Sequence, residues 1–449
     1  MKKLHKLITV IVAATVFAGA NVWAEQSGPG QGITKSATFM VGQWLPSDQQ
    51  FIDQWLGVLI TETGAENREL VPVIQEFKEI IEGDPELYML FHQMFEQIPD
   101  SPKFKRDPTG KPQVRDYRHM LQLMNQVMTK APEFNKTGLV GFPINAILAW
   151  PMGTPAGTTA FLNTKVNRQL KKILTVWAKF LGSNDSRYVL TDDPKRGWFG
   201  RDAGQAMPTF VADFNSNPDQ AYYGFSSWDD FFTRTFREGR RPIAAPDDDT
   251  VIANSCESAP YRLATNVQLR DSFWIKAQPY SLQHMLAMDP LAAQFEGGVV
   301  YQAFLSALSY HRWHSPVSGR IVKTRIIGGS YYAEALTEGF DEAGPNNSQA
   351  YITHVASRAL IFIEADNPDI GLLSVLFVGM GEVSSNEITV YEGQHINKGD
   401  QLGMFHFGGS THCLIFRPGV TLKFDLHGEQ PGVNAKNIPV RAKIATVVK

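Results

Sequence analysis

The spacing of apolar residues changes near the middle of the chain. From about residue 50 to residue 190, apolar side chains recur every three or four positions, which is the period of an amphipathic helix. Residues 71–81 and 166–181 show this pattern most clearly. Between them, Asp84 and Pro85 supply an N-cap and a first-turn proline for another helix. The first half therefore predicts a helical bundle, while residues 153–159, rich in glycine and threonine, are expected to form a loop.

In the second half the period becomes two. Residues 358–364 and 373–379 are short apolar runs bounded by asparagine, proline and glycine, as buried strands are. Residues 389–407 place glycines at short intervals between further strands. A polar stretch rich in turn formers, residues 183–217, separates the halves. We expect an α+β fold, with a helical domain over residues 25–195 and a β-rich catalytic domain over residues 220–449.

Composition narrows the function classes. A chain of 449 residues is long enough for two cores, and 43% hydrophobic with 19% charged residues is ordinary for a globular protein. The net charge of -3 gives no electrostatic basis for binding nucleic acid. Two cysteines can form neither a disulfide framework nor a four-thiolate metal site.

The N-terminus has the pattern of a secretory signal. A basic start is followed by an apolar stretch to about Ala20 and then by Val22-Trp23-Ala24. We expect residues 1–24 to be a signal peptide cleaved after Ala24, and the protein to be exported, to the periplasm if the source is a Gram-negative bacterium. An uncleaved anchor is the alternative, because the apolar run is near the lower limit for a membrane span.

Two segments of the second half carry candidate chemistry. Ser410 follows two glycines, so the carbonyl of Gly409 directly before it is unshielded, although a simple turn would look the same. His311 and His314 stand three residues apart, so they would point to opposite faces of a strand and converge only in a turn. They lack a nearby third ligand, so we expect no metal site.

Two further segments are candidates for a supporting role and for a structural role. Glu257 lies among small residues next to an apolar run, where a partly buried carboxylate could orient a histidine; a solvated loop acid is the alternative. Residues 225–243 predict an aromatic helix face followed by an Arg-Pro turn, which is a structural pattern.

Taken in order, these segments resemble the phosphatidylserine decarboxylase family of pyruvoyl enzymes. Glutamate stands at position 257 where the family usually has aspartate. The branch containing tryptophan decarboxylases is more similar still, because it shares the glutamate and also motifs of the N-terminal half. The matching motifs are Gly409-Ser410-Thr411, Tyr310-His311-Arg312-Trp313-His314, Phe231-Phe232-Thr233-Arg234 and Arg241-Pro242-Ile243.

The resemblance implies self-processing. The Ser410 oxygen would attack the Gly409 carbonyl, and elimination and hydrolysis would convert Ser410 into a pyruvoyl group, the ketone that takes up electrons during decarboxylation. His314 would act as the base, and Glu257 would hold its tautomer. His311 would protonate the carbanion or contact the substrate carboxylate. No pyridoxal phosphate is required.

The resemblance also suggests the products and the substrate. A small α chain, residues 410–449, would stay associated with a large β chain. The substrate would be a free aromatic amino acid, with tryptophan favoured by the branch; phosphatidylserine, a membrane lipid, is the alternative.

Two other functions share part of this sequence pattern. A serine hydrolase using Ser410, His314 and Glu257 would need a G-x-S-x-G elbow, and its second glycine is missing here. A biotinyl or lipoyl carrier would share the glycine turns of residues 392–400 but needs a Met-Lys-Met hairpin, which is absent.

Cys256 and Cys413 lie close in sequence to Glu257 and Ser410, so a disulfide between them would tether the two chains after cleavage. We expect buried free thiols instead, because neighbouring residues of a strand face opposite ways.

Overall fold

The computed structural model describes residues 49–66, 68–100, 114–135, 142–271, 280–306, 308–335, 348–407 and 410–448. The predicted signal peptide, residues 1–24, lies outside the described residues, as do Gly408 and Gly409. Among the described helices, none has the length and apolar character needed to cross a bilayer.

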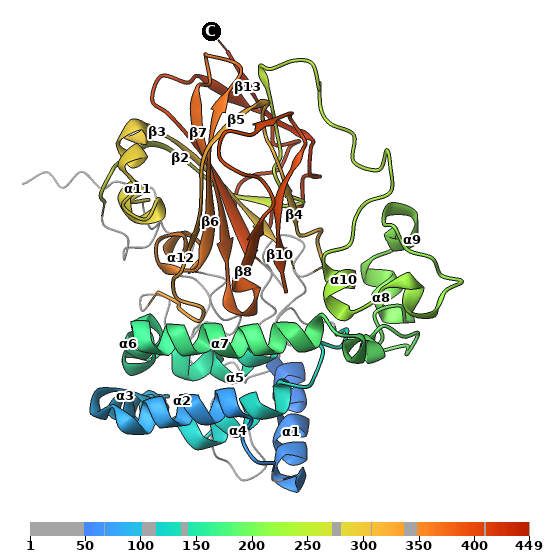
Figure 1. The fold of residues 1–449 in the computed structure, drawn as a ribbon, viewed down its shortest axis with the longest axis vertical. Coiled ribbons are helices and arrows are strands. Elements are labelled where there is room, and N and C mark those ends of the chain that lie inside the picture. Colours follow the sequence, from blue (N-terminus) through green and yellow to red (C-terminus); the bar gives the residue numbers. More distant parts are fainter. Residues whose placement is uncertain are drawn as a thin grey trace, which may run out of the picture. The chain divides into compact units, whose positions relative to one another are not determined.

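Helices dominate the first half, as the periodicity predicts (Figure 1). In α3 the Asp84 side chain caps the first turn, accepting hydrogen bonds from the backbone N–H groups of Glu86 and Leu87, and Pro85 occupies the first helical position. The larger helices are α1 (Gln49–Glu66), α2 (Pro72–Gly83), α3 (Pro85–Glu96), α4 (Tyr117–Val127), α5 (Pro143–Met152), α6 (Pro155–Leu162) and α7 (Thr164–Leu181). Shorter ones are α8 (Arg201–Ala206), α9 (Phe210–Asp213), α10 (Trp228–Phe232), α11 (Leu282–Met285) and α12 (Gln349–Val355).

The loop expected over residues 153–159 is wrong, because α6 begins at Pro155. Thr154 caps this helix by accepting a hydrogen bond from the Gly157 backbone N–H at 3.0 Å, and Pro155 fits its first turn. Glycine is required at 157 because a Cβ there would lie 1.8 Å from the Pro151 carbonyl oxygen. The threonine and the proline are therefore a helix start, and the glycine permits close packing against α5.

The β-rich half is built on a seven-stranded antiparallel sheet with the order β2-β3-β11-β7-β6-β5-β9. Two three-stranded sheets, β1-β13-β12 and β4-β10-β8, accompany it. The strands predicted over residues 358–364 and 373–379 are confirmed as β6 and β7. The bounds are β1 (Val251–Ala253), β2 (Ala259–Val267), β3 (Gly298–Leu305), β4 (Arg312–His314), β5 (Gly319–Ile327), β6 (Arg358–Ala365), β7 (Leu372–Gly379), β8 (Ser385–Ile388), β9 (His395–Ile396), β10 (Gln401–His406), β11 (Ser410–Phe416), β12 (Leu422–Phe424) and β13 (Lys443–Val447).

The seven-stranded sheet is covered on both faces. On one face α12 packs on it, and the Gln302 amide of β3 donates to the Gln349 carbonyl of α12 at 3.0 Å (Figure 1). On the other face the ring of Trp313 in β4 stacks on Phe377 of β7, with centroids 4.1 Å apart. Because both faces are buried, β7 is apolar along almost its whole length.

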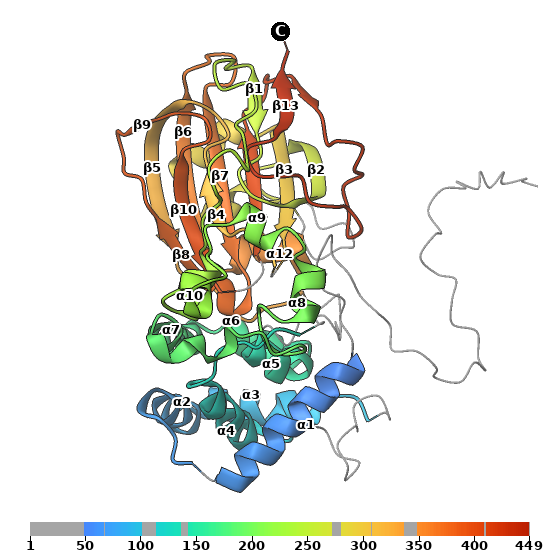
Figure 2. The ribbon, with the colours of Figure 1, turned by 90° about the vertical axis from the view of Figure 1, so that its right-hand side faces the viewer.

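A largely separate core holds the helices, which gives the α+β class predicted. This helical core extends past residue 195, because Trp198, Phe210 and Trp228 belong to it. It also reaches the β-rich half: the Trp177 ring of α7 stacks on Phe407, and Asn167 accepts a hydrogen bond from the Tyr331 backbone N–H at 3.1 Å. Figure 2 shows α7 and α10 near the ends of the strands.

Candidate active site

Ser410 is the first residue of β11, a strand in the interior of the large sheet. Its backbone lies opposite Leu305 of β3 on one side and Gly379 of β7 on the other. Phe407, just before the two glycines, has a φ of 66°, a conformation that bulky residues rarely adopt. Its ring is buried and stacks on Trp177 and Trp228 at 5.8 and 6.0 Å. The helical half thus anchors a strained residue at the start of the predicted cleavage segment.

His314, at the end of β4, is buried and has three polar neighbours. Its Nδ1 lies 2.8 Å from the Gly399 carbonyl oxygen, which can only accept, so Nδ1 carries the proton. Its Nε2 therefore accepts from the Tyr310 hydroxyl at 2.9 Å. Burial, together with the positive charge of Arg441 whose Nη2 is 3.2 Å from Nδ1, lowers the pKa of His314 to about 3. The imidazole is neutral, and its one basic nitrogen, Nε2, already accepts from Tyr310.

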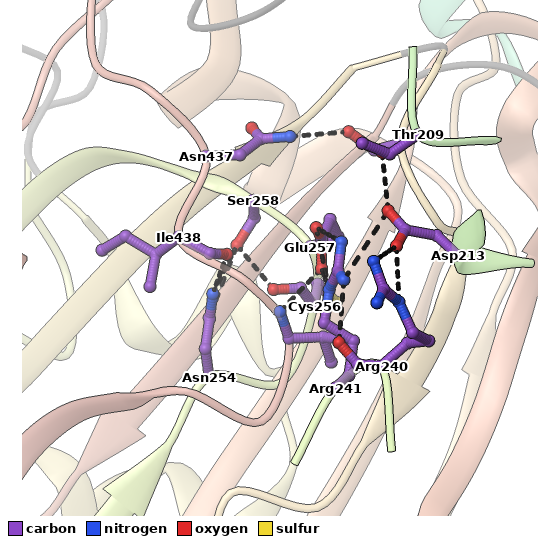
Figure 3. Close-up of polar contacts among 12 residues, drawn as sticks. Thr209, Asp213, Arg240, Arg241, Asn254, Cys256, Glu257, Ser258, Asn437 and Ile438 are labelled. Atoms are coloured by element: carbon purple, nitrogen blue, oxygen red, sulfur yellow. Dashed lines mark hydrogen bonds and ion pairs between the residues drawn. The ribbon is translucent and has the colours of Figure 1, made fainter. Parts of the chain in front are cut away.

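The Glu257 carboxylate does not hydrogen-bond to His314, so the predicted orienting hydrogen bond is wrong in this structure. Its carboxylate accepts from Arg241, with the shortest contact at 2.7 Å (Figure 3). It also accepts from the Val440 backbone N–H at 2.8 Å. The Gly399 carbonyl performs the orienting role instead. Glu257 acts one step away, because it holds the segment that carries Arg441.

Arg441 links the segment bound by Glu257 to His314. It has a φ of 69°, and its Nε donates to the same Gly399 carbonyl at 3.0 Å. The Arg441 guanidinium is thus fixed beside the His314 imidazole, and the Arg441 backbone itself lies in the left-handed region.

His311 precedes β4 and is fully buried against the Phe232 ring, with centroids 4.1 Å apart. The His314 ring stacks on Tyr310 instead, so the two histidines have different aromatic neighbours. The described residues contain no group of three side chains suited to a metal ion. The segment that carries both histidines lies beside β10, the strand that precedes the predicted cleavage segment. The Phe405 backbone N–H of β10 donates to the His311 carbonyl at 2.9 Å.

The segment expected to be structural positions this histidine motif. The Arg234 guanidinium is buried and donates to the Leu308 carbonyl at 2.7 Å and to the Ser309 carbonyl at 3.3 Å. Arg312 donates to the Thr233 carbonyl at 2.7 Å. The Arg234 and Arg312 side chains therefore fix the chain on both sides of His311.

His412 is the site residue that the sequence reasoning missed. It lies two positions after Ser410 on β11, is fully buried, and neither ring nitrogen has a hydrogen bond within the described residues. Its ring lies 6.2 Å from Tyr301 and 6.3 Å from Phe377, and burial lowers its pKa to about 3. The Tyr301 hydroxyl and the Trp313 indole N–H are likewise buried without a hydrogen-bond partner within the described residues. A histidine two positions from the predicted cleavage serine on a strand is the signal that could have found it.

The two cysteines are free and buried. Cys413 lies opposite Gln302 of β3, which hydrogen-bonds to Tyr280. Burial raises the pKa of both thiols, so they are weak nucleophiles.

A strained turn before an interior strand suits chemistry at a fixed backbone position, and a buried neutral imidazole suits acid–base chemistry. The two are not brought into contact, because His314 lies opposite Gln401 at the start of β10, whereas Phe407 follows the end of that strand. Comparison with known proteins identifies the class. Two models described as phosphatidylserine decarboxylase match residues 71–207 and residues 228–440. The chain is a carboxy-lyase and belongs to the phosphatidylserine decarboxylase family, within a branch similar to tryptophan decarboxylases.

The relatives differ in how much of the chain they match. L-tryptophan decarboxylase of Psilocybe cubensis is 39% identical over 83% of this chain and 88% of its own length. Decarboxylase iboD of Amanita muscaria is 41% identical over 69% of this chain and 92% of its own length. Phosphatidylserine decarboxylase proenzyme 3 of Schizosaccharomyces pombe is 30% identical over 46% of this chain and 21% of its own length.

The Glu257–Arg241 pair yields a stability prediction. Glu257→Gln leaves the mostly buried Arg241 without its nearest negative charge, so the free energy of unfolding should fall by about 2–3 kcal/mol. Glu364→Gln, at an exposed position of β6, is the control and should change it by less than about 0.5 kcal/mol. Urea unfolding followed by circular dichroism measures both; equal midpoints for the two variants would show that the pair does not stabilise the fold.

Proposed function

We propose that this protein is a self-processing, pyruvoyl-dependent decarboxylase of a free aromatic amino acid, with L-tryptophan as the preferred substrate. The observation that carries the substrate class is the extent of similarity. The tryptophan decarboxylases match 83% and 87% of the chain, whereas the phosphatidylserine decarboxylase proenzymes match between 45% and 49%.

Processing begins, in this proposal, with attack of the Ser410 oxygen on the Gly409 carbonyl carbon. The peptide C–N bond breaks as an ester forms, and His314 takes the hydroxyl proton. Elimination then releases the Gly409 carboxylate and leaves a dehydroalanine at 410, and water hydrolyses it to a pyruvoyl group with loss of ammonia. The neutral state of His314 supports the assignment of the base, because a protonated imidazole could not accept the proton. The Tyr310 hydroxyl occupies the acceptor nitrogen Nε2 at 2.9 Å, so in this proposal it relays the proton or moves aside.

The surroundings of position 410 fit a pyruvoyl group at the start of β11. Backbone pairing with β3 and β7 fixes the residue that would carry the ketone, and the ketone supplies the acceptor for the electrons left by departing carbon dioxide. His311 is the residue proposed to deliver a proton or to contact the substrate carboxylate, and its backbone is fixed by Phe405.

The proposed α chain, residues 410–449, would remain bound without a covalent link. It includes β11 between β3 and β7, and β13 beside β1. The Asn254 side chain also donates to the Ile438 carbonyl at 2.9 Å, and Glu257 accepts from Val440 at 2.8 Å (Figure 3). These contacts support self-association of the two chains.

The first prediction of this proposal concerns cleavage. Purified wild-type protein should give two chains under denaturing conditions, the smaller beginning at position 410, because Ser410 supplies the attacking oxygen. Ser410→Ala should stay full length and inactive, and Ser306→Ala, a buried serine near the end of β3, serves as the control that still cleaves. Intact mass spectrometry measures the chains. A cleaved and active Ser410→Ala protein would overturn the proposal.

The second prediction concerns the substrate. Carbon dioxide release is measured with L-tryptophan, L-phenylalanine and phosphatidylserine micelles, each at the same concentration. The processed protein should release carbon dioxide fastest with L-tryptophan. Release from the lipid alone would establish the alternative, a phosphatidylserine decarboxylase.

The third prediction concerns export. We propose that residues 1–24 direct secretion and are removed after Ala24, because their basic start and apolar stretch match a signal peptide. The large chain recovered from the expressing cells should begin at Glu25, as read by N-terminal sequencing. A large chain that begins at Met1 would contradict removal of the signal.

A further inference from the structure

A buried carboxylate stands at the end of β7, close to the strand position of the cleavage serine. Gly379, the last residue of β7, pairs with Ser410, and Glu382 follows three residues later in the turn Gly381–Ser384. Only 1% of Glu382 is exposed. Its Oε1 accepts from the backbone N–H groups of Ile144 and Asn145, at 2.7 and 2.9 Å, at the start of α5. The helical half thus docks on the catalytic sheet through this oxygen.

The Glu382 carboxyl also accepts from its own backbone N–H, and its second oxygen has no hydrogen bond to another described residue. Two neighbouring polar atoms likewise lack a partner within the described residues. These are the Tyr332 hydroxyl and the Asn145 side-chain oxygen. A Cβ on Gly381 would lie 3.6 Å from the Tyr332 ring and 3.8 Å from the Asn145 Cβ, so both side chains border this turn. Buried polar atoms without partners cost free energy, and a group of them calls for a ligand that supplies the missing hydrogen bonds.

The chemistry of the cluster limits what this ligand is. Glu382 has no ion pair with a cation in the described structure, and burial raises its pKa to about 7. An ionised carboxylate here accepts hydrogen bonds and repels anions such as a phosphodiester. The nearby rings of Tyr332 and Phe161, with centroids 6.5 Å apart, offer apolar surface. An aromatic ring that carries an N–H group meets both conditions.

We propose that the free oxygen of Glu382 accepts a hydrogen bond from the ring N–H of the aromatic amino-acid substrate, which makes Glu382 a specificity-determining residue and α5 a wall of the substrate site. This inference rests on the proposed decarboxylation of an aromatic amino acid. It gives the helical half a direct part in choosing the substrate, through the helix that Glu382 holds.

The decisive substitution is Glu382→Gln. The two N–H groups of α5 both face Oε1, so the glutamine oxygen must take that position and its NH₂ group must take the free one. The variant keeps the contact with α5 but presents a donor where the wild type presents an acceptor. Glu364→Gln, at an exposed carboxylate of β6, is the matched control.

The measurement is the ratio of kcat/KM for L-tryptophan to that for 3-(benzothiophen-3-yl)-alanine, in which sulfur replaces the ring N–H. Wild type and Glu364→Gln should both prefer L-tryptophan by about 10-fold to 100-fold, since the analogue leaves the acceptor unpaired. Glu382→Gln should bring the ratio close to 1 while still cleaving into two chains.

Two results would overturn the inference. One is a wild-type ratio near 1, which needs no variant and so decides the matter even if Glu382→Gln fails to fold. The other is an unchanged ratio in a folded, processed Glu382→Gln protein. Failure of the proposed function looks different, because the wild-type protein would then release no carbon dioxide from any aromatic amino acid.

Discussion

The site depends on the position of β11 inside the large sheet. Backbone pairing with β3 and with β7 runs from Ser410 to Phe416, so the strand is held along both edges. A break before position 410 would leave that pairing intact, which is why a cut chain can keep its structure. The same pairing fixes the first residue of the strand, where a reactive group needs to be held still for chemistry.

The helical half supplies what the sheet alone lacks. The rings of Trp177 and Trp228 hold Phe407 in its strained conformation just before the proposed cleavage segment. The start of α5 binds Glu382, just after the end of β7 that pairs with Ser410. Both contacts are buried, so they join the helical half to the β-rich half.

Local patterns predicted the elements well, and contacts between distant segments explain what they missed. The α+β class, α2, α3, α7, β6 and β7 followed from period and capping, which are properties of neighbouring residues. The partners of Glu257 could not be predicted, because Arg241 and Val440 approach it only in the folded chain. His412 and Glu382 were missed since burial without a hydrogen bond is a property of the assembled core. Thr154 and Pro155 are a helix-start signal present in the sequence, and α6 begins there.

The central claim is that a reactive carbonyl forms at residue 410. The most direct test is reductive trapping: the purified protein is incubated with L-tryptophan and sodium cyanoborohydride, and its chains are separated under denaturing conditions and weighed by mass spectrometry. The account predicts a covalent adduct on the chain of residues 410–449, at its first residue, and none on the long chain. An unmodified short chain, or an adduct confined to a lysine of the long chain, would contradict it.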